Sequence, residues 1–447
     1  MKHLKRWLPL FLIVLLALVL GACGGGQSEP SEEQTGETSQ TEQTSTGPVI
    51  FLSTQARPVE EQEKMRNNIL ANAPVEVEFI AEDTGVFIDR VKSEVQTGKG
   101  EVSLLGALHG DFAALTNELD DLTPLLNELS DRGFPDQFVE LGKLGTTEQK
   151  YIPWMQATYI FAANKEALQY LPEGADINAL TWEQLLEWGK NIYEATGEAK
   201  LGFPAGDKGL LHRFLEGYLY PSYTGTMVTG FRSPEAVAMW EQFREIWKYT
   251  NPQSTTYSFM QEPLLSGEVW VAFDHTARLI EAFRERPDDF VAFPAPAGPK
   301  GRGFMPVLAG LAIPKSAPNK AGAEEVIKYL TTPEVQAETL RQIGFFPVVA
   351  GDLPEDIDVG IRAEGEAVAK QAAAPDALPA LLPVGLGEQN NAFNQVYKDT
   401  FLRIIINGED IQTVLQEEGD KLQEILNTAG APCWPPDPPS DGVCQVK

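Results

Sequence analysis

Strand-like and helix-like segments alternate along most of this chain. Candidate strands cover residues 49–52, 75–80 and 102–108, and candidate helices cover residues 58–70 and 86–96 between them. Successive strands separated by helices usually lie parallel in one sheet, with the helices packed on its faces. The pattern therefore predicts an α/β fold with a parallel sheet covered on both faces.

Later helices carry clear start signals. Thr181 and Gln184 have the spacing of a capping box. Trp182, Trp240 and Trp247 lie on the apolar faces of two such helices. We therefore expect these rings in the core and not at a ligand.

Length and charge limit what the chain can bind. The patterned region, residues 48–428, is longer than the ~250–300 residues at which one hydrophobic core stops growing, so we expect two lobes. The formal net charge is −29. Nucleic-acid binding needs basic patches, so this charge argues against it, and solubility explains most of the charge.

The first residues have the order of an export signal. Lys2, Lys5 and Arg6 precede an apolar run at residues 7–20, which suits a signal peptide of residues 1–22. The sequence Leu-Gly-Ala-Cys that ends at Cys23 resembles a bacterial lipobox. That resemblance implies a lipid on Cys23, anchored to the outer face of the cytoplasmic membrane. An ordinary signal peptide with an incidental cysteine is the alternative.

A polar segment follows the lipobox. Residues 23–47 contain no Lys or Arg and, after the cysteine, no large apolar side chain. Such a segment cannot bury enough surface to offset its ordering entropy. We expect it to be a flexible acidic linker with a reach of roughly 25–30 Å.

The last segment, residues 431–447, is rich in proline and holds Cys433 and Cys444. Outside the cytoplasm a close pair of cysteines oxidises readily. We expect a local disulfide that contributes about 3 kcal/mol. Free thiols or zinc ligation are the alternatives, but no histidine or third cysteine lies nearby.

Several short motifs occur in one order along residues 48–428. The order resembles the carbohydrate-binding class of extracellular solute-binding proteins, which includes maltose-binding protein. The motifs are LDDLTP (119–124), YIP (151–153), NK (164–165), TWEQL (181–185), SGEVWVAF (266–273), PAPAG (294–298), GLAIP (310–314) and YLTTPE (329–334).

The resemblance implies a two-lobed periplasmic-binding-protein-like fold with a ligand cleft between hinge-linked, discontinuous lobes. Hinge closure of such lobes traps the ligand. It also implies delivery of the solute to the permease subunits of an ABC importer, no cofactor, and a monomer. The chain should cross near residues 157, 300 and 348. The implied segments are 48–157 and 301–347 in lobe 1, 158–300 and 348–430 in lobe 2, and the tail 431–447.

Ligand contacts follow from positions in the same pattern. Carboxylates and amides accept from sugar hydroxyls, Arg donates, and aromatic rings cover C–H faces. The side chains differ from those of maltose-binding protein at nearly every position, so the particular sugar cannot be carried over. The expected contacts are Gln55, Arg57, His109, Asp111, Trp154, Gln156, His212, Arg213, Tyr218, Asp274, His275, Arg278 and Phe393.

The charge of the ligand follows from how the expected cleft residues pair. Arg57, Arg213 and Arg278 suit a phosphate or carboxylate, so a glycerol phosphodiester or sugar phosphate is the alternative ligand. Asp111 and Asp274 lie in the same expected cleft and would neutralise two of these three arginines. A neutral mono- or oligosaccharide is therefore favoured.

A metal site and a catalytic site are the rival interpretations of the histidines and their acidic neighbours. His109, His212 and His275 are scattered through the chain, so no metal site is expected. Motifs of serine hydrolases, zinc proteases and phosphate loops are absent from the sequence. Asp274 and His275 beside Arg278 lack an obvious nucleophile, which makes a secreted hydrolase the lesser hypothesis and a binding protein the favoured one.

Overall fold

Three sheets organise the part of the chain that this computed structural model describes, residues 47–351 and 353–447. Thr44–Lys447 form one unit. The expected signal peptide (1–22), the lipidation site Cys23 and the linker up to residue 46 lie outside the described residues.

The first sheet has five strands in the order β2-β1-β3-β10-β4. The central strand β1 lies parallel to β2 and β3, whereas β10 lies antiparallel to both β3 and β4. An all-parallel sheet was therefore the wrong prediction. The chain enters β10 from β9 (Arg302–Phe304), which lies outside this sheet, and not through a crossover helix on it, so nothing forces a parallel direction. The strands are β1 (Val49–Ser53), β2 (Val77–Ala81), β3 (Leu104–Leu108), β4 (Ile152–Ala157) and β10 (Val307–Ala312).

Helices accompany this sheet because its strands bury side chains on both faces, as Phe51 and Leu52 do. A start signal of the sequence is used at α13, where the Thr332 hydroxyl accepts from Val335 N. The helices are α1 (Val59–Lys64), α2 (Thr84–Thr97), α3 (His109–Ala113), α4 (Thr123–Glu128), α5 (Asp136–Gly142), α12 (Lys320–Leu330) and α13 (Pro333–Ile343).

The second sheet has four strands in the order β6-β7-β5-β8. A further pair, β9 and β11, runs parallel beside it. The strands are β5 (Tyr159–Asn164), β6 (Leu201–Gly202), β7 (Val271–His275), β8 (Phe290–Phe293), β9 (Arg302–Phe304) and β11 (Ala377–Pro379).

The helix that follows Thr181 begins where its capping residue predicts. The capping box of α6 is confirmed, since Thr181 accepts from Gln184 N and Gln184 accepts from Thr181 N. Trp182 and Trp240 are fully buried, as expected. The helices are α6 (Trp182–Thr196), α7 (Leu211–Phe214), α8 (Tyr220–Thr224), α9 (Pro234–Trp247), α10 (Gln261–Ser266), α11 (Thr276–Glu285), α14 (Val359–Ala372), α15 (Asn390–Phe401) and α16 (Ile411–Ala429).

Shorter helical pieces connect these elements. One π-helical turn, η5, joins α7 to α8 in a single helical run. The π turns are η1 (Met65–Ile69), η5 (Leu215–Leu219) and η8 (Leu402–Ile406). The 3₁₀ turns are η2 (Ser130–Arg132), η3 (Lys165–Tyr170), η4 (Ile177–Ala179), η6 (Pro252–Thr255) and η7 (Gly387–Gln389).

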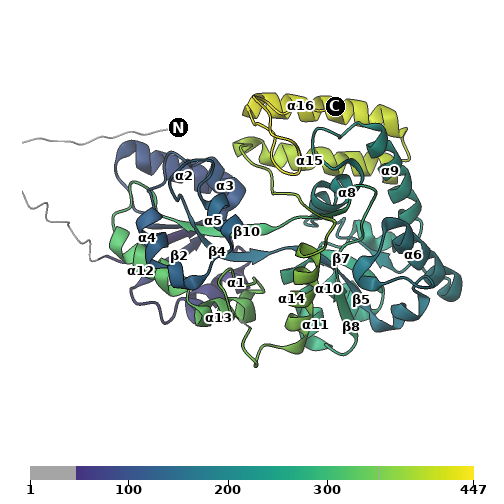
Figure 1. Cartoon of the computed structure of the whole chain (residues 1–447), viewed down its shortest axis with the longest axis horizontal. Coiled ribbons are helices and arrows are strands. Elements are labelled where there is room, and N and C mark those ends of the chain that lie inside the picture. The colour runs from purple at the N-terminus through teal and green to yellow at the C-terminus, as the bar shows by residue number, and fades with distance from the viewer. Residues whose placement is uncertain (1–46, 352) are drawn as a thin grey trace, which may run out of the picture. The chain divides into compact units, whose positions relative to one another are not determined.

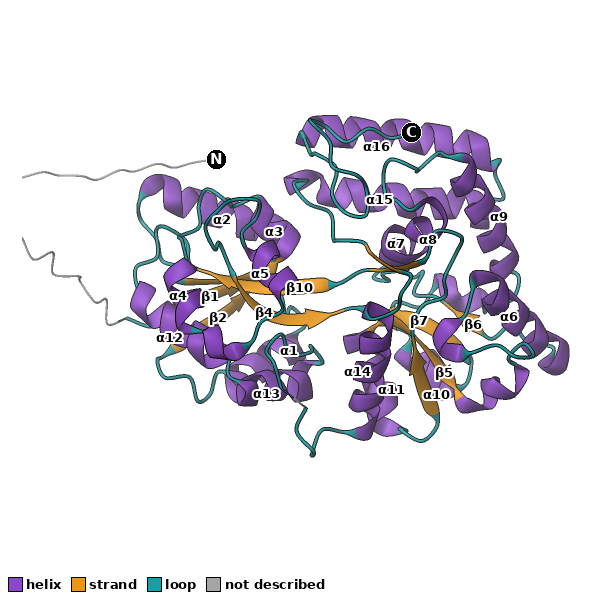
Figure 2. Cartoon of the chain, viewed as in Figure 1, coloured by secondary structure: helices purple, strands orange, loops and turns teal. Residues whose placement is uncertain are grey.

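The chain passes three times between the two groups of elements (Figures 1 and 2). The first passage leads from β4 to β5 through Thr158, and the second leads from β9 to β10 through Met305. The third follows Phe346, which is bridged to Gln156 of β4. The Thr158 hydroxyl donates to the Met305 carbonyl at 2.9 Å, and Gln156 Nε2 donates to the Pro347 carbonyl at 2.7 Å. Side chains therefore tie the three passages together.

The C-terminal tail is docked on the second group of elements. Cys433 and Cys444 are joined by a disulfide. Between them, the buried Asp437 carboxylate accepts hydrogen bonds from three successive backbone N–H groups, those of residues 227–229. Trp434 packs on Phe393 of α15 with ring centroids 5.5 Å apart. The tail therefore supports the buried face of α15.

Candidate functional site

A polar cavity of about 460 Å³ lies between the first group of elements and the second. One wall comes from the residues after β1 and β3 and from α2. The other comes from α7, from the segment of residues 382–387, and from α15. Figure 2 shows α2, α3 and α15 on one side of the connecting strands. The cavity therefore lies between the two groups of elements, which are joined along the chain by the three passages.

The first wall is built where parallel strands end. Arg57 follows β1, and Asp111 follows β3 in the short helix α3. Carboxyl ends of neighbouring parallel strands meet at one edge of a sheet, which is where ligands bind in open α/β sheets. Thr54 Oγ1 donates to Asp111 at 2.9 Å, and Arg57 forms an ion pair with Asp83. Burial raises the pKa of the Asp111 carboxyl, and the hydrogen bond from Thr54 opposes that rise.

At one point the two walls touch. A Cβ atom on Gly110 would collide with the carbonyl oxygen of Pro383, which belongs to the opposite wall. Only glycine permits this approach. The two groups of elements are therefore in contact at the edge of the cavity.

The second wall begins with His212 and Arg213 in α7. Arg213 Nη1 donates to Glu216 at 2.7 Å, and the Glu216 side chain is completely buried. Burial raises the pKa of Glu216 to about 7, and the positive charge of Arg213 opposes this rise. Burial also lowers the pKa of His212 well below its ordinary value, so its imidazole is neutral.

Helix α15 completes the second wall with a polar face. Asn390, Asn394 and Lys398 recur every four residues and so lie on one side of the helix, next to Asn391 and Gln395. The opposite side, including Phe393, is buried in the core. The sequence interpretation missed this polar face, although its spacing of four residues was a usable signal.

Four of the thirteen expected contacts line this cavity. They are Arg57, Asp111, His212 and Arg213. Two of them come from each wall, so the structure brings together residues that are 101 to 156 positions apart in sequence.

The three expected aromatic contacts lie in the core and not in the cavity. Trp154, Tyr218 and Phe393 each have no exposed surface. Trp154 packs against Phe51, and the Tyr218 hydroxyl bonds to Thr158 at the first passage. These rings are large enough to stabilise cores by apolar burial, and the strands and helices turn them inward.

Three other expected contacts serve neighbouring protein groups. His109 Nδ1 lies 3.1 Å from the Tyr151 hydroxyl, and burial lowers the pKa of His109 to about 4. Gln156 donates to the third passage, as described above. Gln55 Nε2 donates to Thr54 Oγ1 at 3.0 Å, next to the cavity wall.

The remaining expected contacts lie around the end of β7, outside the cavity. The buried Asp274 carboxylate accepts from the N–H groups of Met260 and His275. His275 Nδ1 accepts from Ala277 N, and burial lowers the pKa of His275 to about 3. Arg278 donates to the Ser258 carbonyl at 3.0 Å.

Asp111 and Asp274 form no direct ion pair with an arginine among the described residues, although the charge of Arg213 opposes the rise in the pKa of Asp111 and the charge of Arg278 opposes the rise in the pKa of Asp274. Arg213 pairs with Glu216, and Arg57 pairs with Asp83. Asp274 is occupied by backbone N–H groups and forms no ion pair among the described residues. This pairing therefore gives a neutral ligand less support than expected, because the ion-pair partners of Arg57 and Arg213 are Asp83 and Glu216.

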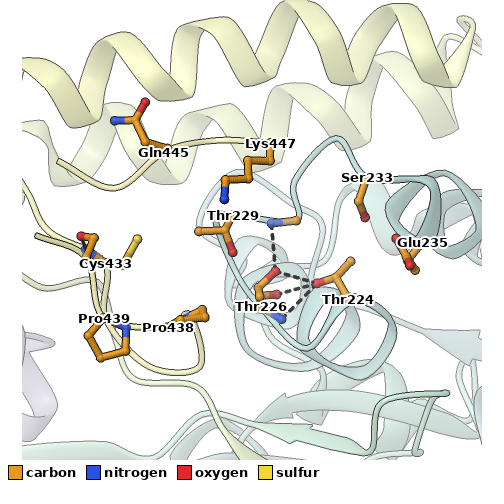
Figure 3. A pocket seen from close by; sticks show the side chains of 12 residues that line it. Thr224, Thr226, Thr229, Ser233, Glu235, Cys433, Pro438, Pro439, Gln445 and Lys447 are labelled. Carbon is orange, nitrogen blue, oxygen red and sulfur yellow. Dashed lines mark hydrogen bonds between the residues drawn. The ribbon is translucent and has the colours of Figure 1, made fainter. Parts of the chain in front are cut away.

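A second hollow of about 330 Å³ lies beside the tail (Figure 3). Its hydroxyl groups are largely used within the wall: Thr224 Oγ1 bonds to Thr226, and Thr226 Oγ1 accepts from Gly230 N. Lys447 and Cys433 of the tail form its other side. This hollow is a consequence of tail docking and lies apart from the passages between the two groups of elements.

Within residues 47–351 and 353–447, no group of three or more His, Cys, Asp or Glu side chains is arranged to hold a metal ion. No helix of the same residues has both the length and the apolar character needed to cross a membrane.

Two groups of elements, three connecting passages and a polar cavity between the groups define a two-lobed solute-binding protein of the periplasmic-binding-protein type. Residues 57–337 match the family of bacterial extracellular solute-binding proteins. The chain belongs to this family.

Solved structures share the fold at low sequence identity. The maltose-bound MalE3 of T. maritima is 20% identical with a TM-score of 0.67, covering 85% of this chain and 100% of that one. The GacH receptor of Streptomyces glaucescens is 18% identical with a TM-score of 0.63, covering 86% and 99%. UgpB from Mycobacterium tuberculosis, in complex with glycerophosphocholine, is 19% identical with a TM-score of 0.64, covering 86% and 99%. No curated protein matches the sequence.

Proposed function

We propose that this chain is a substrate-binding lipoprotein that captures a small polyhydroxylated solute of the mono- or oligosaccharide class. It delivers this solute to the permease subunits of an ABC importer. The observation that carries the proposal is the polar cavity, because Arg57 and Asp111 face it from one lobe and His212 and Arg213 from the other. A ligand that bonds to both walls stabilises the closed arrangement over the open one.

The connecting passages are suited to a hinge. Thr158, Tyr218 and Met305 link two of the passages through hydrogen bonds, and Gln156 links the third to β4. The lobes can rotate about these tied segments while each keeps its own core, as in hinge closure of binding proteins. The lobe boundaries near residues 157, 300 and 348 belong to this proposal.

Binding without turnover is part of the proposal. In the cluster that looks catalytic in the sequence, the side chains of Asp274, His275 and Arg278 bond to backbone groups of residues 260, 277 and 258. The cavity wall carries no Ser, Cys or Tyr as a nucleophile. A secreted hydrolase is therefore disfavoured.

The cellular setting rests on the sequence. Lipid on Cys23 and the linker of residues 23–47 would hold a monomeric receptor at the outer face of the cytoplasmic membrane. The two lobes would then search for the permease within the reach of the linker.

Thermal unfolding of the purified protein against a panel of sugars, polyols and their phosphorylated forms tests the proposal. A true ligand at 100 times its dissociation constant stabilises the fold by about 2.7 kcal/mol. The ligand should also reduce the radius of gyration in small-angle scattering. A ligand that stabilises the Arg213→Ala variant as much as the parent would show that this cavity is not the binding site.

A further inference from the structure

The side chains that line the cavity include more cations than carboxylates, unlike the protein as a whole. The chain carries 64 acidic and 35 basic residues. The cavity wall instead presents three cationic side chains, Arg57, Arg213 and Lys398, against a single carboxylate, Asp111. Concave sites between low-dielectric walls focus the field of the charges that line them. Arg57 and Arg213 are paired with Asp83 and Glu216, so the unpaired positive charge of the wall lies on Lys398.

Lys398 is the cation without a protein partner. It lies on the polar face of α15, and no carboxylate of the described residues lies within 4.0 Å of its ammonium group. Its charge lowers the pKa of His212 and opposes the rise in the pKa of Glu216. Its field therefore reaches the α7 part of the wall, where Arg213 lies.

The groups around Lys398 have unused hydrogen-bonding capacity. His212 is 6% exposed, and its Nδ1 atom has no hydrogen-bond partner among the described residues. The buried Oδ1 atom of Asn394 also lacks one. Buried polar atoms are nearly always paired, so each of these atoms indicates a missing partner. A neutral imidazole and an amide are suited to the hydroxyl groups of a ligand.

The wall offers no ring on which a sugar could stack. None of its residues is Trp, Tyr or Phe. Aromatic rings are the natural cover for the apolar C–H face of a saccharide. Recognition in this cavity therefore depends on hydrogen bonds and charge, which favours a compact ligand with many polar groups.

We propose that the captured solute is a compact polyhydroxylated anion. Its carboxylate or phosphate group binds Lys398 and Arg213, and its hydroxyl groups bind His212, Asn394 and Asp111. This inference rests on the proposed function and specifies the chemistry of its ligand. A carboxylate and a phosphate share the required negative charge and acceptor oxygens.

Isothermal titration of the purified full-length protein tests the inference with three sets of probes. The neutral probes are D-glucose and D-galactose, the carboxylate probes are D-glucuronate and D-galacturonate, and the phosphate probes are glucose 6-phosphate and glycerol 3-phosphate. We expect one anionic set to bind at least tenfold more tightly than the neutral set, because hydrogen bonds to charged groups are worth about 1.5–3 kcal/mol. Which anionic set binds identifies the source of the charge.

Salt and a charge-removing variant separate recognition from non-specific attraction. Binding of the anionic probe should weaken between about 0.01 M and about 1 M salt, as the Debye length falls from about 30 to about 3 Å. Lys398→Met should lose about tenfold or more in affinity for the anionic probe. Lys190→Met is the matched control, since Lys190 is an exposed lysine of α6 outside the cavity. Both variants should keep the thermal midpoint of the parent.

The outcomes distinguish the inference from the function on which it rests. If neutral sugars bind and their anionic counterparts bind no better, the inference is wrong and the proposed function stands. If an anionic probe binds equally to the parent and to Lys398→Met, the assignment of its charged group to Lys398 is wrong. If no probe of any set binds, the inference of a compact anion is wrong, and the thermal-unfolding panel of sugars and polyols decides the proposed function separately.

Discussion

Replacing Asp437 with alanine should destabilise the protein strongly, although this residue lies outside the cavity. The Asp437 side chain is 3% exposed and accepts from the N–H groups of Met227, Val228 and Thr229 at 2.6–3.2 Å. Alanine leaves three donors without an acceptor, two of them buried. Hydrogen bonds to a charged group contribute roughly 1.5–3 kcal/mol each and do not add fully when shared, so we expect a loss of about 3–6 kcal/mol.

Differential scanning calorimetry measures this loss. An unfolding entropy of roughly 2.1 cal/mol/K per residue amounts to about 0.8 kcal/mol/K for Thr44–Lys447. The expected loss therefore lowers the thermal midpoint by about 4–7 °C. Asp437→Asn should fall between parent and alanine variant, because its amide retains one acceptor oxygen.

Asp441→Ala is the control, because Asp441 is an exposed carboxylate of the same tail. It should leave the midpoint within about 1 °C of the parent. If Asp437→Ala behaves like this control, the carboxylate does not hold the tail in place and the account of tail docking is refuted.

Three further predictions address other parts of the molecule. The pKa of Glu216 is about 7 in the folded protein and 4.5 ordinarily, so between these pH values the unfolded chain binds fewer protons than the folded one. The free energy of unfolding should therefore decline by up to about 3 kcal/mol as pH rises through that window. Chemical denaturation should show a smaller decline for Glu216→Gln. Gly106→Ala should cost about 1–3 kcal/mol in the same assay, because the new Cβ would lie 2.7 Å from the Phe51 ring, and an unchanged midpoint would contradict the packing of β3. Cys23→Ser should move the protein from the membrane fraction to the medium, whereas retention on membranes would exclude the lipid anchor.

Patterns local in sequence predicted much of the fold. The capping box at Thr181 and the start of α13 at Thr332 were predictable because their partners lie three residues away. The antiparallel direction of β10 was not predictable from local patterns, because it depends on which distant element of the fold precedes this strand. Local sequence signals define where helices and strands begin and end. The pairing of the strands depends on contacts between segments that are far apart in sequence.

A residue of the candidate site was predictable when its position relative to a strand end determines that it faces the cavity. Asp111 follows a parallel strand of the first sheet, and that position faces the cavity. Trp154 and Phe393 could face either way from sequence alone, since an aromatic side chain suits both a core and a sugar. The ion-pair partner of Arg213 is Glu216, three residues further along the chain. The sequence interpretation placed its partner across the cleft instead.

The docked tail makes one wall of the cavity depend on a disulfide. Thiols stay reduced in the cytoplasm, and disulfides form and persist in oxidising compartments. The Cys433–Cys444 link holds the segment that carries Trp434 and Asp437, and Trp434 supports the helix whose other face lines the cavity. In a newly made chain we therefore expect the tail to support this cavity wall fully only after the disulfide has formed in an oxidising compartment. The affinity for solute should therefore be lower before the disulfide forms than after it.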